Sequence, residues 1–311
     1  MQTDTNNHPH SHPYPGGTPA ARFDRAFAIG VVLNAGFVLV EWTFGVLANS
    51  LALIADASHN LGDVLGLLLA WGAAALARRR PSPRFTYGLR SSTILAALAN
   101  AALLLVITGG IAWEAILRFK NPASIDAPVV IWVAALGILI NTATALLFMS
   151  GRKQDLNLRG AYLHMAADAA VSLGVVIAGL LTLATGWNWL DPVVSLAIVA
   201  VILLGTWGLL RDAIRLALHA VPEGVDPASV RRFLERQPGV GEVHDLHIWG
   251  MSTTETALTA HLVMPGGYPG DAFIAALADR MDCDFGIAHA TLQVETGSGE
   301  QPCALAPDHV V

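Results

Sequence analysis

Long apolar runs separated by short polar joints fill the chain from residue 26 to residue 218. Six of these runs reach the roughly 20 residues that a helix needs to cross the hydrocarbon core of a bilayer. The six runs are Ala26–Leu47, Leu51–Ala77, Thr93–Leu117, Ala127–Met149, Gly160–Thr185 and Pro192–Leu210. The joints between them carry proline, glycine and charged residues. The pattern therefore predicts a membrane all-α bundle of six transmembrane helices over residues 26–218.

A different pattern begins after residues 219–225, which are predicted to form a linker. Residues 226–296 contain short elements in the order helix, strand, strand, helix, strand. The elements are Asp226–Gln237 with Asp226 as N-cap, Glu242–Trp249, Thr256–Met264, Asp271–Asp282 and Ile287–Glu295. This order predicts a small C-terminal α+β domain of the ferredoxin-like kind. Residues 1–25 and 297–311 have no periodic pattern, and we expect them to be disordered.

Composition and charge agree with a membrane protein, because 54% of the residues are apolar and only 14% are charged. The net charge of −6 and the lack of a basic run among aromatic residues argue against nucleic acid as a partner. If both termini are cytoplasmic, the outer loops carry only two basic residues, Arg118 and Lys120. The basic residues at the inner ends are then Arg22, Arg25, Arg78, Arg79, Arg80, Arg84, Arg90, Arg152, Lys153, Arg159, Arg211 and Arg215. We therefore expect a multi-pass protein of an inner membrane with both termini and both cysteines, Cys283 and Cys303, in the cytoplasm.

Ionisable side chains inside the predicted spans indicate a function, since inserting each into a bilayer costs a free energy of roughly 2.5–3.5 kcal/mol. They are Glu41, Asp56, His59, Asp63, Glu114, His164 and Asp168. Glu41 and Asp56 lie toward the outer ends of their helices, where a polar exit path and an interfacial carboxylate are both open interpretations. Glu114 is expected at the interface. Asn34 and Asn141 are better explained by packing between helices than by metal contact.

Four of these residues form two identical pairs, His59-x-x-x-Asp63 and His164-x-x-x-Asp168. The spacing of four residues puts both members of a pair on one helix face. Because the two helices run in opposite directions, packing them together would place His59 level with Asp168 and Asp63 level with His164. Two imidazoles and two carboxylates suit a tetrahedral Zn²⁺, and protons compete with the metal for the same ligands. The alternative, two hydrogen-bonded pairs that serve packing, does not explain why the pattern occurs twice.

Two other classes of function compete with metal transport as explanations of this pattern. A membrane-embedded zinc enzyme commonly keeps three protein ligands and an open position, and the chain has no HExxH or GxSxG motif. We therefore expect no enzyme and no organic cofactor. A membrane-anchored metal sensor is disfavoured because an anchor has no use for buried charge.

Several stretches resemble one known family. They are SLALIADASHNLGDVLGLLLAW, RFTYGLRSSTILAALANAALLLV, LNLRGAYLHMAADAAVSLGVV, LDPVVSLAIVAVILL and VHDLHIWGMS. These stretches resemble the cation diffusion facilitator family, in particular its zinc, cadmium and cobalt exporting branch, over roughly residues 22–296. The resemblance implies a homodimeric metal/proton antiporter whose transport ligands are His59, Asp63, His164 and Asp168. It also implies a cytoplasmic domain that binds metal and stabilises the dimer.

The cytoplasmic metal positions implied by the resemblance are His244, His261 and Glu295, where Zn²⁺ would have a structural or a regulatory role. His289 remains open as a further ligand. We expect His247 to be a structural or surface residue, because strand alternation would point His244 and His247 to opposite faces.

Two departures from the family pattern concern loops. Some members of the family bind metal through histidines in the loop between the second and third helices, but Arg78–Arg90 has no histidine, so we expect no metal there. Some also have a histidine-rich loop between the fourth and fifth helices, and Ser150–Arg159 has no histidine either. The N-terminal leader, residues 1–25, instead holds His8, His10 and His12, which either capture metal weakly or belong to a disordered tail.

Overall fold

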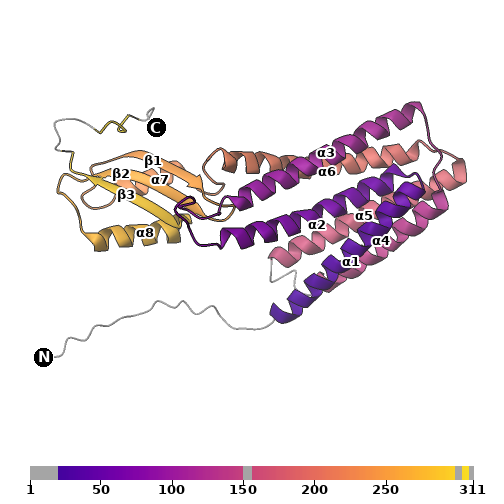
Figure 1. The fold of residues 1–311 in the computed structure, drawn as a ribbon, viewed down its shortest axis with the longest axis horizontal. Helices are drawn as coiled ribbons and strands as arrows, with labels where there is room; N and C mark the ends of the chain where they lie inside the picture. Colours follow the sequence, from indigo (N-terminus) through magenta and orange to yellow (C-terminus); the bar gives the residue numbers. More distant parts are fainter. Residues whose placement is uncertain (1–19, 150–155, 298–302, 308–311) are drawn as a thin grey trace.

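Six long helices form one end of an elongated molecule, and a small α+β domain forms the other (Figure 1). The computed structural model describes residues 20–149, 156–297 and 303–307. The long helices are α1 (Ala20–Leu47), α2 (Leu51–Ala77), α3 (Ser92–Lys120), α4 (Ala127–Met149), α5 (Leu156–Thr185) and α6 (Leu190–Ala217). The predicted leader with His8, His10 and His12 lies outside the described residues.

Five of the described helices, α2 to α6, are long and apolar enough to cross a membrane, and α1 contributes the shorter apolar stretch Val32–Leu47. Four helices extend beyond the predicted apolar runs: α1 begins at Ala20, within the segment expected to be disordered, α3 continues to Lys120, α5 begins at Leu156 and α6 spans Leu190–Ala217. Backbone hydrogen bonds do not stop where an apolar run stops, so a helix continues into polar residues at the membrane surface. Pro192 is tolerated because it lies in the first turn of α6.

A buried carboxylate joins α6 to the beginning of α2. Asp191 Oδ1 accepts a hydrogen bond from Ser50 Oγ at 2.5 Å, and Asp191 Oδ2 accepts one from the backbone N–H of Leu51 at 2.8 Å. Unpaired N–H groups at a helix N-terminus attract negative charge, so this contact pairs the buried carboxylate with the end of α2. Asp191 thereby fixes the starting point of the helix that carries His59 and Asp63.

The α+β domain consists of α7 (Pro227–Glu235), β1 (Glu242–Gly250), β2 (Thr256–Val263), α8 (Asp271–Phe285) and β3 (His289–Glu295). β1 and β2 form an antiparallel pair, and β3 lies parallel to β2 after the crossover through α8. The described part of the domain therefore holds a sheet in the order β1-β2-β3.

The two helices of this domain pack on one face of the sheet. Leu258 and Leu262 of β2 belong to the same buried cluster as Leu234 of α7 and Met281 of α8. Side chains alternate along a strand, so His261 lies on the other face, which α7 and α8 do not cover.

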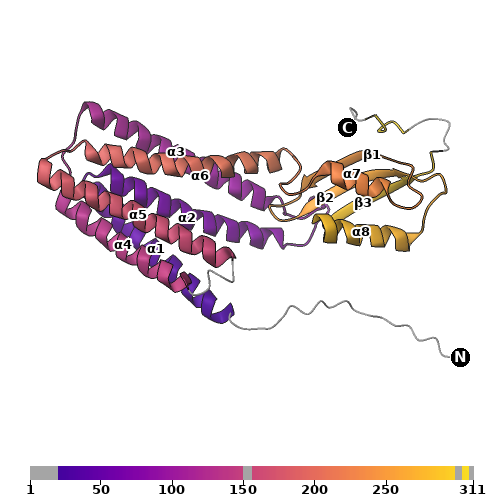
Figure 2. The same ribbon diagram turned by 180° about the vertical axis from the view of Figure 1, so that it is seen from behind.

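The turn between β1 and β2 meets the first turn of α3. Arg90 forms an ion pair with Glu255 at 2.5 Å, and the backbone N–H of Thr253 donates to Thr93 Oγ1 at 3.1 Å. Figure 2 shows this junction from behind, with the connected ends of β1 and β2 beside the beginning of α3. The α+β domain is thus tied directly to a helix of the bundle.

Candidate metal centres

The two His-x-x-x-Asp pairs face one another across the contact between α2 and α5. His164 Nε2 lies 3.1 Å from Asp63 Oδ2, and His59 Nε2 lies 3.7 Å from Asp168 Oδ1. Within each helix the corresponding distances are 3.8 Å for His59 to Asp63 and 3.6 Å for His164 to Asp168. The structure brings all four predicted residues together, with each histidine level with the aspartate of the other helix.

These separations suit a single ion between the four side chains. Ligands about 2.0–2.2 Å from a tetrahedral zinc lie roughly 3.3 Å from one another. Ligand atoms of His59, Asp63 and His164 lie within 4.8 Å of one another, and the oxygens of Asp168 face both histidines. Apart from their ion pairs with the histidines of the site, Asp63 Oδ2 and Asp168 Oδ2 have no hydrogen-bond partner among the described residues. Two carboxylates between two imidazoles are a donor set suited to a dication.

Exposure changes along the quartet, which is our name for His59, Asp63, His164 and Asp168. The side chain of Asp168 is 3% exposed and that of His59 is 23% exposed. The other cross-helix pair is more open, with His164 at 38% and Asp63 at 33%. α2 runs toward the α+β domain and α5 away from it (Figure 1), so Asp63, which follows His59, and His164, which precedes Asp168, are the members nearer that domain. The pair nearer the α+β domain is therefore the more exposed of the two cross-helix pairs.

Further polar groups lie beyond Asp168, the most buried member of the quartet. Ser172 lies one turn beyond Asp168 on α5 and donates to Asp56 Oδ2 at 3.2 Å. Asp56 and Glu41 are both fully buried. This burial excludes the interpretation of the two acids as exposed interfacial carboxylates. Glu114, in contrast, is half-exposed and pairs with Arg118.

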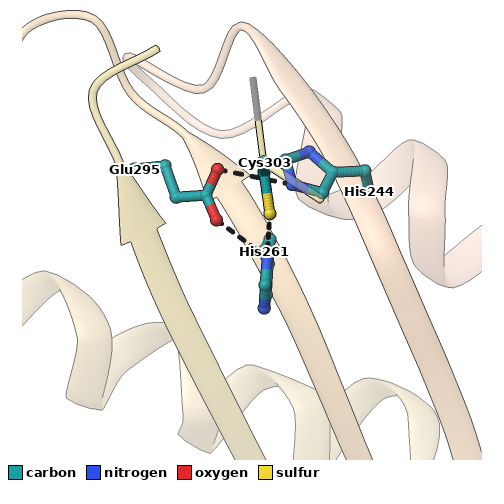
Figure 3. Close-up of side chains that lie close together, drawn as sticks. All are labelled: His244, His261, Glu295 and Cys303. Atoms are coloured by element: carbon teal, nitrogen blue, oxygen red, sulfur yellow. Dashed lines mark hydrogen bonds and ion pairs between the residues drawn. The ribbon is translucent and has the colours of Figure 1, made fainter. Parts of the chain in front are cut away.

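A second cluster lies on the helix-free face of the sheet. The strand register places His244 opposite His261 and Glu295 opposite Val263, so all three side chains share this face. His261 Nδ1 lies 2.8 Å from Glu295 Oε1, and His244 Nε2 lies 3.4 Å from Glu295 Oε2. Figure 3 shows the three side chains converging, joined by Cys303. The structure therefore brings the three predicted cytoplasmic residues together.

The chemistry of this cluster fits a metal ion. His244 is almost fully buried, and neither of its ring nitrogens has a hydrogen-bond partner in the described part of the chain. Burial raises the pKa of Glu295, but hydrogen bonds from Cys303 and Gln293 and the nearby His244 and His261 outweigh it and hold the pKa below its ordinary value. Glu295 is therefore available as a carboxylate ligand.

The prediction that His244 and His247 point to opposite faces is wrong. His244 pairs with His261 and His247 with Thr259, so a bulge in β1 returns both histidines to one face. Asp245 occupies the bulge with φ 49. Its carboxylate lies 2.8 Å from His247 Nε2 and 3.4 Å from His261 Nε2. A carboxylate behind a ligating histidine holds the ring in place, so Asp245 orients His261.

His289 does not join the cluster. It lies at the exposed beginning of β3, where its ring contacts Tyr87 edge-on at a centroid separation of 5.7 Å. Cys303 joins the cluster although sequence patterning gave it no role. A cysteine shortly after a strand that ends in a candidate ligand was the available signal.

Within the segment expected to be disordered, the structure describes residues 303–307. They include a turn in which the N–H of Ala306 donates to the carbonyl of Cys303 at 3.1 Å. Contacts of Cys303 with His261 and Glu295 hold this turn against the sheet.

Comparisons with known proteins agree with this architecture. A family model described as the cation efflux transmembrane domain matches residues 27–216, and one described as the cation efflux protein cytoplasmic domain matches residues 222–297. The cation efflux system protein CzcD of Alcaligenes sp. (strain CT14) is 36% identical over 94% of this chain and 91% of its own length. The zinc transporter ZitB of Escherichia coli is 36% identical over 95% and 93%.

One further relative and one solved structure are also similar to this chain. The cadmium, cobalt and zinc/H(+)-K(+) antiporter of Bacillus subtilis is 32% identical over 88% of this chain and 89% of its own length. A solved structure, the metal-bound C-terminal domain of the CzcD transporter from Cupriavidus metallidurans, is 33% identical over 23% of this chain and 99% of that chain, with a TM-score of 0.22. With both family models matching along the chain and relatives above 30% identity over most of it, this protein belongs to the cation efflux family, also known as the cation diffusion facilitators.

Proposed function

We propose that this protein exports divalent metal ions from the cytoplasm in exchange for protons, with Zn²⁺ as the main substrate and Cd²⁺ and Co²⁺ as further substrates. The observation that carries this proposal is the convergence of His59, Asp63, His164 and Asp168 between α2 and α5. The printed names of the relatives support it, since one is a zinc transporter and another an antiporter of cadmium, cobalt and zinc with protons and potassium.

The exchange follows from charge balance in the quartet. Two aspartates neutralise a bound dication, so the loaded site is nearly neutral in a medium where net charge is expensive. When the metal leaves, two carboxylates remain, and protons compete for them and for the imidazoles. The imidazoles of His59 and His164 and the two carboxylates are therefore the groups that can carry the exchanged protons.

The accessibility of the quartet supports a direction of loading. Asp63 and His164 form the open side, toward the α+β domain, and Asp168 forms the closed side. With this domain in the cytoplasm, metal enters past Asp63 and His164. Rocking of α2 against α5 then exposes Asp168, and the buried acids Asp56 and Glu41 line the exit.

The assembly that we propose retains the predicted domain plan. Residues 26–218 form six transmembrane helices, with α1 as the first, and residues 219–225 connect them to a ferredoxin-like domain at 226–296. Both termini lie on the cytoplasmic side of an inner membrane, as the distribution of arginine and lysine favours. Two copies form a homodimer, which the match to a cytoplasmic-domain model of this family supports.

The second metal position belongs to the cytoplasmic domain. His244, His261 and Glu295 would hold Zn²⁺ there in a structural or regulatory role, and the burial of His244 without a hydrogen bond among the described residues supports this assignment. No organic cofactor enters the mechanism.

Transport in sealed proteoliposomes tests the proposal. The purified chain is reconstituted, an acid-inside pH gradient is imposed, and the uptake of Zn²⁺, Cd²⁺ and Mn²⁺ is measured with and without a protonophore. We expect uptake of Zn²⁺ and Cd²⁺ that collapses with the gradient and little uptake of Mn²⁺, which prefers oxygen ligands. Folded, reconstituted protein without gradient-dependent zinc uptake would contradict the proposal and favour a metal sensor.

A further inference from the structure

The cytoplasmic cluster has a fourth member, Cys303, from the C-terminal tail. Its Sγ lies 3.6 Å from His261 Nδ1, and the four side chains surround a common point (Figure 3). We propose that Cys303 closes the cytoplasmic site as its fourth ligand, so that a Zn²⁺ or Cd²⁺ ion is held by His244, His261, Glu295 and the Cys303 thiolate. This inference rests on the proposed role of the other three residues as a metal site.

The spacing of the donor atoms supports coordination. Zinc bonds of about 2.0–2.1 Å to nitrogen and 2.3 Å to sulfur place the donors of a tetrahedral site roughly 3.3–3.6 Å apart. The sulfur of Cys303 lies 3.6 Å from His261, and His244 lies 3.4 Å from Glu295. One donor atom from each of the four residues lies within 4.8 Å of every other. The cluster needs only small side-chain movements to surround an ion.

The unsatisfied histidine is an independent observation. His244 is 4% exposed, and among the described residues neither ring nitrogen has a hydrogen-bond partner. Leaving a buried polar group unpaired is costly, so a buried imidazole calls for a partner. A metal ion between His244 and Cys303 supplies one. A hydrogen bond between Cys303 and His261 alone would leave His244 with only its ion-pair contact to Glu295 at 3.4 Å.

The donor set defines the role of the site. Thiolate and imidazole ligands favour Zn²⁺ and Cd²⁺ over Mn²⁺ and Mg²⁺. Four protein ligands with no open position are typical of zinc that is held rather than passed on or used in catalysis. The quartet in the membrane contains no sulfur, so the two sites divide the work: the quartet carries metal and the cytoplasmic site retains it.

Coordination by Cys303 also links the tail to the sheet. A tail without secondary structure is ordinarily poorly ordered unless something ties it down. Here the turn 303–307 is placed over β2 and β3 through Cys303. Binding of cytoplasmic zinc is therefore expected to order the tail, and its loss to release it.

Cobalt absorption by the full chain tests the thiolate directly. Cys283 and Cys303 are the only cysteines in the sequence, so Cys283→Ser leaves one thiol. Co²⁺ bound to a thiolate gives an intense near-ultraviolet charge-transfer band, which histidine and carboxylate ligands do not give. We expect the band in wild type and in Cys283→Ser, and its loss in Cys303→Ser and in His261→Ala.

Zinc competition adds a second readout. We expect Cys303→Ser to weaken the site that competes for Co²⁺ by at least about tenfold, a loss found even for partners outside the ligand shell. Zn²⁺ should protect Cys303 from alkylation in the Cys283→Ser protein. No charge-transfer band in Cys283→Ser, or a band that persists in His261→Ala, would overturn the assignment of Cys303.

The same set of proteins separates this inference from the proposed function. If His261→Ala loses the part of the visible cobalt absorption that the cytoplasmic site contributes, while no charge-transfer band exists in Cys283→Ser, the three-residue site stands and only the thiolate is refuted. Gradient-driven zinc uptake by Cys303→Ser is measured in parallel. Uptake by Cys303→Ser supports transport by the quartet whatever the outcome for Cys303. A lack of uptake by wild type refutes transport separately.

Discussion

His164 Nε2 of α5 lies 3.1 Å from Asp63 Oδ2 of α2, and this contact crosses the boundary between the two helices. His59 and Asp168 make the opposite crossing at 3.7 Å. Neither helix alone holds the complete donor set. The separations between donors therefore depend on how α2 packs against its neighbours, and displacement of α2 should impair the quartet.

Gly62 offers a way to displace α2. A methyl group at Gly62 would lie 2.1 Å from Leu104 Cδ2 of α3, so Gly62→Ala forces Leu104 or α2 to move. Because Asp63 follows directly, we expect zinc uptake to fall several-fold. Gly72→Ala on the same helix is the matched control, since nothing lies within 4 Å of the added methyl group.

The double variant Gly62→Ala with Leu104→Ala should regain part of the lost uptake, because the smaller side chain makes room. Wild-type uptake in Gly62→Ala alone would show that close packing of α2 on α3 is not needed for transport.

Protons on the loading side should weaken metal binding. Asp63 and His164 form the accessible side of the quartet, and both must be deprotonated to ligate zinc. We expect the zinc concentration for half-maximal uptake to rise as the pH on that side falls from about 7.5 to about 6, because more protons then compete with zinc for these donor atoms. A half-maximal concentration that does not change with pH would argue against protons and metal sharing these ligands.

Asp191 should be important for stability. Asp191→Ala leaves the Ser50 hydroxyl and the N–H groups of Leu51 and Ala52 without this acceptor, and each unsatisfied buried group costs about 1–3 kcal/mol. We expect a clearly lower midpoint of thermal unfolding in detergent. Asp212→Ala, a half-exposed aspartate on the same helix, should change the midpoint little. Equal midpoints for the two variants would refute this role.

Asp226 stabilises the beginning of α7. The hydroxyl of Ser229 and the N–H groups of Ala228 and Ser229 donate to its carboxylate and hold the pKa of Asp226 below its ordinary value. A carboxyl group with a lowered folded pKa contributes stability above its unfolded pKa, and this contribution is lost as the pH falls through the folded pKa.

Thermal unfolding of Asp226→Ala measured against pH tests this helix cap. At neutral pH the variant should unfold at a lower temperature than wild type, and the difference should shrink below about pH 4. Asp279→Ala, an exposed residue of α8, should show no such dependence. A difference between Asp226→Ala and wild type that does not vary with pH would contradict the role of the charge.

Apolar runs predicted the positions of the six helices, because length and hydropathy decide where a helix lies in a membrane chain. The facing pairs of the quartet followed from a spacing of four residues and opposite helix directions. Local pattern could not predict that Glu41 and Asp56 are fully buried, since burial depends on which neighbours cover them. Nor did it identify Asp191, whose partners lie at residues 50–52.

In the α+β domain, strand alternation failed at one place. The bulge at Asp245 shifts the alternation by one residue, and this reversed the expected face of His247. The position of Cys303 depends on the path of the tail over the sheet, and no periodic pattern encodes that path. Both misses concern residues that the tertiary structure places beside His261.

Zinc uptake by quartet variants tests the central claim most directly. Asp63→Ala and Asp168→Ala are compared with wild type and with Glu114→Gln, which alters a half-exposed membrane carboxylate outside the quartet. All four proteins are reconstituted at equal amounts under the same acid-inside gradient, and folding is checked by thermal unfolding. The account predicts that both aspartate variants lose gradient-driven uptake while Glu114→Gln keeps it. Wild-type uptake in either folded aspartate variant would contradict the quartet as the transport site.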